Sequence, residues 1–140
     1  MFNRTLIIDD NRRYTKMLQE RLEQRGCKVE KVLSARDSIK HFSLVEPNHY
    51  QIIFTDITME TQVSGIYLTY RIRRRLGFKG CLIIYSTGFN FPIVLWISRL
   101  FFRALGADGL IPKRGLIDGR PRLAAISKHP FLKFVGNVLS

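Results

Sequence analysis

The chain has 140 residues, of which 46% are hydrophobic and 24% are charged, the composition of a globular protein that needs no structural disulfide or metal. The two cysteines, Cys27 and Cys81, exclude a disulfide framework, and we find neither a signal peptide nor an apolar run suited to a membrane span. The 23 lysines and arginines against 11 acidic residues give a net charge of +12, which predicts attraction to an acidic protein, a nucleic acid or an anionic membrane surface. We expect one cytoplasmic domain, residues 1–140.

Strand and helix patterns alternate from the N-terminus onward. The first helix is predicted after Asn11 and ends near Gly26, a suitable C-terminal cap, and the second begins at Ser34, a suitable N-cap, and ends at Pro47. A third helical pattern follows Gly65. Four apolar or alternating runs have the length of strands: residues 5–8, 28–33, 50–55 and 81–85.

The last part of the chain is less regular. A long apolar stretch, residues 91–105, precedes a short predicted strand at residues 110–111. We place the core of the domain at residues 4–115 and expect residues 116–140 to form a last helix and a tail. Strands that alternate with helices and are apolar throughout predict an α/β fold, in which helices cover both faces of a parallel sheet.

Polar residues stand at the ends of the predicted strands. Asp9 and Asp10 follow the first strand, Asp56 the third, Thr87 the fourth and Lys113 the fifth. The carboxyl ends of parallel strands meet at one side of a sheet, where ligands bind. Oxygen ligands without His or Cys suit Mg²⁺, and a lysine and a hydroxyl beside them suit a phosphoryl group. These residues therefore predict a metal site with a nucleophilic carboxylate, whereas the first two aspartates alone could be a solvated strand end with a helix cap.

Four segments, LIIDD, IIFTDITM, IIYSTG and GADGLIPK, occur in an order and at intervals that resemble the receiver domains of two-component response regulators, the CheY-like superfamily. The resemblance covers residues 5–113. It implies a flavodoxin-like three-layer sandwich, with a five-stranded parallel sheet of order 2-1-3-4-5. It also implies a role for each matching residue: Asp56 as phosphoacceptor, Asp10 as direct Mg²⁺ ligand, Asp9 as ligand through water, the Thr58 carbonyl as a further ligand, Thr87 as switch hydroxyl and Lys113 as partner of the phosphoryl group.

The chain departs from the family pattern around this site. Glu60 replaces the proline that usually follows the acceptor, and Gly65 comes one residue later than usual. Leu110 stands at the aromatic switch position, and Arg114 replaces the proline that usually follows the lysine. The segment from Thr87 to Lys113 is also longer than usual. These changes concern the read-out elements more than the phosphorylation chemistry.

The resemblance predicts a stand-alone phosphorylation switch rather than a metabolic enzyme. A histidine kinase or phosphotransfer protein would donate the phosphoryl group, and the output would be contact with a downstream protein. One alternative is a pseudo-receiver that binds an acidic partner without phosphorylation, which the +12 charge and the changed positions favour. A weaker alternative is a small metal-dependent phosphohydrolase.

Two further segments have an open interpretation. The arginine-rich run at residues 71–75 is read as a solvated helix face; a nucleic-acid patch is the less favoured reading, since no nucleic-acid-binding motif accompanies it. The aromatic-rich stretch is either a deeply buried helix or an exposed patch for a partner, and residues 89–113 could form a homodimer surface.

Overall fold

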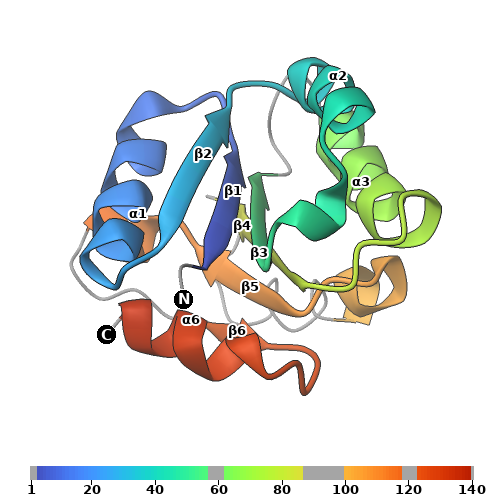
Figure 1. Cartoon of the computed structure of the whole chain (residues 1–140). Helices are drawn as coiled ribbons and strands as arrows, with labels where there is room; N and C mark the ends of the chain where they lie inside the picture. Colours follow the sequence, from blue (N-terminus) through green and yellow to red (C-terminus); the bar gives the residue numbers. More distant parts are fainter. Residues whose placement is uncertain (1–2, 57–61, 87–99, 118–122, 140) are drawn as a thin grey trace.

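A six-stranded sheet of order β2-β1-β3-β4-β5-β6 organises the computed structural model, which describes residues 3–56, 62–86, 100–117 and 123–139 (Figure 1). The first five strands are mutually parallel, and β6 is antiparallel to β5. The strands are β1 Arg4–Ile8, β2 Lys28–Val32, β3 Ile52–Asp56, β4 Cys81–Ser86, β5 Gly109–Pro112 and β6 Ala124–Ala125. The predicted order of the first five strands is therefore confirmed.

Helices cover the sheet on both faces, as the apolar strands predicted (Figure 1). One face packs against α1 and α6, and the other packs against α2 and α3. Residues 100–105 are also helical and extend the layer formed by α2 and α3. Phe102 in this segment packs on Ile84 and Leu110. The helices are α1 Arg12–Gln24, α2 Ala35–Leu44, α3 Gln62–Tyr70, α5 Arg114–Ile117 and α6 Phe131–Leu139; a 3-10 turn occupies Pro47–His49, and a π-helical turn, Arg71–Arg75, continues α3. None of the helices in the described parts of the chain is long and apolar enough to cross a membrane.

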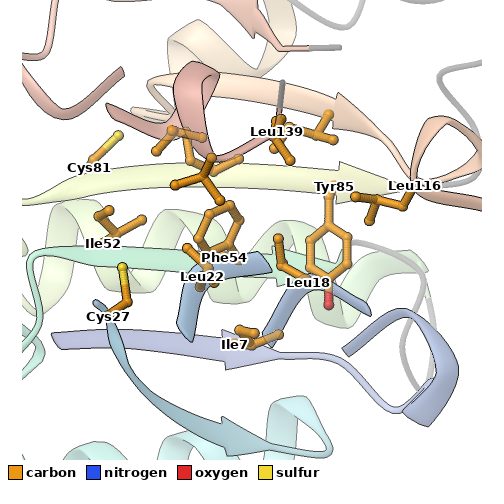
Figure 2. Packing of buried hydrophobic residues seen from close by; sticks show 14 of the residues in the cluster. Ile7, Leu18, Leu22, Cys27, Ile52, Phe54, Cys81, Tyr85, Leu116 and Leu139 are labelled. Atoms are coloured by element: carbon orange, nitrogen blue, oxygen red, sulfur yellow. The ribbon is translucent and has the colours of Figure 1, made fainter. Parts of the chain in front are cut away.

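The largest apolar cluster lies between the sheet and the layer of α1 and α6 (Figure 2). Leu18 and Leu22 from α1 meet Ile7 and Phe54 from the sheet, and all four side chains are buried. Burial of such side chains contributes roughly 1.5–3 kcal/mol each. The flavodoxin-like sandwich of the sequence prediction is thus the observed fold.

The sheet has one strand more than the five predicted, at its C-terminal end. β6 adds a sixth strand, whose residues Ala124 and Ala125 pair with Leu110 and Gly109. The last helix, α6, begins only at Phe131, and the short helix α5 lies between β5 and β6. Two alanines give no strand signal, because alanine is depleted in strands.

Loss of the cap of α1 gives a first testable prediction. The side chain of Asn11 accepts hydrogen bonds from the backbone N–H groups of Arg13 and Tyr14, at 3.0 and 3.3 Å. Asn11→Ala leaves these donors without their acceptor and should lower the free energy of unfolding by about 1 kcal/mol, whereas Asn11→Gly should cost only a few tenths. Urea denaturation measures both values. Lys16→Ala, at an exposed position of the same helix, is the control, and an equal loss in all three variants would contradict a capping role.

Candidate functional site

Two aspartates and a lysine meet at the carboxyl end of the sheet. Asp9 follows β1, Asp56 ends β3 and Lys113 follows β5, with only 0%, 1% and 2% of their surfaces exposed. The Lys113 ammonium lies 2.9 Å from Asp9 Oδ2 and 2.8 Å from Asp56 Oδ2. One buried cation therefore bridges two buried carboxylates.

The register of the parallel strands brings these residues together. Ile8 pairs with Thr55, Asp56 with Tyr85, and Ser86 with Pro112, so the neighbouring strands end at nearly the same level. Side chains just beyond these ends project into the same space. This arrangement places at one end of the sheet residues that are far apart in the sequence, as the pattern of strand ends predicted.

Asp9 is held by three donors. Its Oδ1 accepts a hydrogen bond from the Asn11 backbone N–H at 3.1 Å, and its Oδ2 accepts one from the Tyr85 hydroxyl at 2.8 Å in addition to contacting Lys113. Burial raises the pKa of Asp9 to about 6, although Lys113 and the hydrogen bonds act in the opposite direction. The carboxyl orientation is fixed on both of its oxygens.

Asp10 completes a group of three carboxylates. It is exposed, unlike the other two, and one oxygen of each of Asp9, Asp10 and Asp56 lies within 4.8 Å of the others. Oxygen ligands of this number suit Mg²⁺, which is commonly held by one or two carboxylates and retains several waters. The side chains present therefore fit the ion that the sequence predicts.

Two tyrosines complete the surroundings of Lys113. Its ammonium lies 4.9 Å from the ring centroid of Tyr14, on α1, and 4.7 Å from that of Tyr85, on β4. Neither tyrosine was predicted as a site residue: Tyr85 belongs to the predicted strand at residues 81–85, and Tyr14 lies in the first predicted helix. The one sequence feature that points to Tyr85 as a site residue is its position two residues before Thr87, close to the end of a predicted strand.

Some of the predicted site lies outside the described residues. These are Thr58, Thr87, Glu60 and residues 89–99 of the predicted homodimer surface, whereas residues 100–113 of that surface are described. In that described part, Leu100 and Phe101 are exposed, whereas Leu110 is fully buried against Ile84. Leu110 thus occupies the aromatic switch position as a core residue.

The response regulator receiver domain family matches residues 5–115, and the chain belongs to this family. The chain is therefore a receiver domain of the kind found in two-component response regulators, with Asp9, Asp56 and Lys113 at the carboxyl end of its sheet.

Known proteins resemble the chain in parts of their sequence or in fold. Hybrid signal transduction histidine kinase L of Dictyostelium discoideum is 31% identical over 75 residues, which cover 54% of this chain and only 4% of that protein. The receiver domain of Francisella response regulator 1452 has a TM-score of 0.67 at 18% identity, with 98% of this chain and 95% of that chain covered. A Burkholderia pseudomallei response regulator, solved with a phosphorylated aspartic acid, calcium ion and citrate, has a TM-score of 0.61 at 20% identity, with 77% and 58% covered. The two structures show a shared fold.

Proposed function

We propose that the chain accepts a phosphoryl group on Asp56 from the phosphohistidine of a histidine kinase or phosphotransfer protein, with Mg²⁺, and signals through contact with another protein. The observation that carries this proposal is the position of Asp56. It is buried at the carboxyl end of the sheet, bound by Lys113 and close to the carboxylates of Asp9 and Asp10.

The proposed transfer needs little covalent chemistry from the protein. A carboxylate oxygen of Asp56 attacks the phosphorus, and the N–P bond of the phosphohistidine breaks with its electron pair returning to the imidazole. Asp10, Asp56 and the Thr58 carbonyl would hold Mg²⁺, with Asp9 acting through water, and the bound ion would offset the negative charge of the phosphoryl group. Lys113 stabilises the same charge from the buried side, and the Thr87 hydroxyl would donate a hydrogen bond to the phosphoryl group.

Two comparisons support this proposal. The Dictyostelium relative is a hybrid histidine kinase, a protein of the signalling system that uses receivers. The Burkholderia neighbour carries a phosphorylated aspartic acid and a cation in its structure. Both facts concern those proteins, and they make phosphorylation with a divalent cation the natural function to test here.

Intact-protein mass spectrometry after incubation with acetyl phosphate and Mg²⁺ tests the proposal. We expect a gain of one phosphoryl group, about 80 Da, that is lost in Asp56→Asn and after chelation of the metal. Asp37→Asn, at the exposed start of α2, is the matched control and should be phosphorylated like the unchanged protein. A folded protein that gains no mass, or gains it in Asp56→Asn, would contradict the proposal.

A second candidate function is binding of an acidic partner without phosphorylation. The net charge of +12 and the burial of Leu110 as an apolar core residue favour it. Binding would then be independent of metal and phosphodonor, whereas a phosphorylation switch would change its partner affinity when Asp56 is modified.

A further inference from the structure

Lys113 must point at Asp56 for either the ion pair or the proposed transfer. The lysine side chain is a flexible four-carbon stem, so the direction of its ammonium has to be fixed by neighbouring groups. The residue after Lys113 is Arg114, which leaves the backbone freer than a proline would. The described surroundings therefore have to supply the restraint.

Two aromatic rings flank the ammonium. The distances of 4.9 Å to Tyr14 and 4.7 Å to Tyr85 are within the range of about 6 Å in which a ring attracts a cation. The ammonium has three donors, and Asp9 and Asp56 take two of them. Because Lys113, Tyr85 and the two carboxylates are buried, the attraction between the ammonium and the rings is stronger than it would be in water.

Tyr85 is itself firmly held. Its ring meets Phe54 edge-on, with centroids 6.4 Å apart, and its hydroxyl reaches from β4 past β3 to Asp9 (Figure 2). Burial and the nearby carboxylates raise the pKa of Tyr85 well above 10, so the hydroxyl remains a donor at neutral pH. Tyr85 thus orients one of the carboxylates that Lys113 contacts.

We propose that Tyr14 and Tyr85 form an aromatic clamp that positions the Lys113 ammonium between Asp9 and Asp56. The two tyrosines are positioning residues, since they act through the lysine. The clamp exists whether or not the protein is phosphorylated, and only its effect on phosphoryl transfer rests on the proposed function. A chain with proline after the lysine would need such a clamp less.

The test compares Tyr14→Leu with Tyr14→Phe, because Tyr14 is only partly buried and both variants should fold. The first removes the ring, and the second removes only a hydroxyl. NMR spectroscopy of the Lys113 ε-methylene protons reports the rings directly, through an upfield ring-current shift. We expect this shift in the unchanged protein and in Tyr14→Phe, and a clearly smaller shift in Tyr14→Leu. Phosphorylation by acetyl phosphate should slow about tenfold in Tyr14→Leu only.

The outcomes separate the clamp from the proposed function. An unchanged shift in Tyr14→Leu would overturn the clamp. A shift that depends on Tyr14 in a protein that acetyl phosphate does not modify would support the clamp and contradict phosphorylation of Asp56. Equal slowing of phosphorylation in Tyr14→Leu and Tyr14→Phe would also overturn the clamp, since it would assign the effect to the hydroxyl.

Discussion

Replacing Asp108 with alanine is expected to lower the free energy of unfolding by about 3 kcal/mol. Asp108 Oδ2 lies 2.6 Å from the Arg73 guanidinium and also accepts the Leu82 backbone N–H at 2.9 Å, while Oδ1 accepts the Ser127 hydroxyl at 2.6 Å. Alanine would leave all three donors without this acceptor. The lost ion pair is largely buried, since the side chains of Arg73 and Asp108 are only 16% and 10% exposed. The loss falls at the lower end of the range for breaking a buried ion pair, because backbone carbonyls still accept from Arg73.

Urea denaturation followed by circular dichroism measures this effect. The remaining acceptors of Arg73 are the carbonyls of Gly106, Phe78 and Gly80, at 2.7, 2.6 and 3.1 Å. Asp108→Asn can still accept a hydrogen bond at one oxygen, so its free energy of unfolding should fall less than that of Asp108→Ala. Arg75→Ala, at an exposed position of the same turn as Arg73, should stay within about 0.5 kcal/mol of the unchanged protein. A loss below about 1 kcal/mol in Asp108→Ala would show that the network does not stabilise the fold.

The sheet and its acidic end were predictable because both depend on local patterns. Short runs that are apolar throughout, such as β3 and β4, are typical of strands buried on both faces, and such strands are found in parallel sheets. Once the strands are parallel, Asp9, Asp56 and Lys113 must come together, since each follows or ends a strand at the same side. The cap at Ser34 was predictable for a similar reason, because a cap residue acts within three residues of itself, whereas the cap of α1 is Asn11 rather than one of the two aspartates before it.

Arg73 shows what such patterns miss. The arginine-rich run was interpreted as a solvated face or a nucleic-acid patch, yet Arg73 lies in the π-helical turn with an acidic partner 35 positions along the chain. Gly106 makes the contact possible: it has a φ of +94°, and a Cβ there would lie 2.3 Å from Arg73 Cγ. A pairing that depends on a distant acid and on the absence of a side chain has no local signal. Arg74 and Arg75 are exposed, as predicted.

The clamp residues and β6 were missed for the same physical reason. An aromatic residue in a helical stripe or a strand packs in a core far more often than it flanks a cation, so Tyr14 and Tyr85 carried no distinctive signal. β6 is specified by tertiary contacts: the backbone N–H groups of Ile126 and Ser127 both donate to the Asp108 carbonyl, at 2.8 and 3.2 Å. Long-range hydrogen bonds of this kind override the weak strand propensity of two alanines.

Lys113→Met is expected to lower the free energy of unfolding by about 3–5 kcal/mol at neutral pH without Mg²⁺, because it removes the cation that two buried carboxylates share. Burial already raises the pKa of Asp9 to about 6 with Lys113 present, and loss of the lysine should raise it further. The folded variant then binds more protons than the unfolded chain, whose aspartates titrate near pH 3.9, so its stability falls as pH rises above about 4. The deficit relative to the unchanged protein should therefore be smaller at about pH 5 than at about pH 7.5.

A double variant isolates the cause of this loss. In Lys113→Met with Asp56→Asn, one carboxylate charge is gone, so the double variant should be more stable than Lys113→Met alone, although it carries one more substitution. Lys133→Met, at an exposed position of α6, controls for the change of side chain and should have little effect. Mg²⁺ should stabilise Lys113→Met more than the unchanged protein, since the ion would replace the missing positive charge beside the carboxylates. If neither Asp56→Asn nor Mg²⁺ raises the free energy of unfolding of Lys113→Met, the lower stability of this variant arises from packing around Lys113 rather than from uncompensated charge at the site.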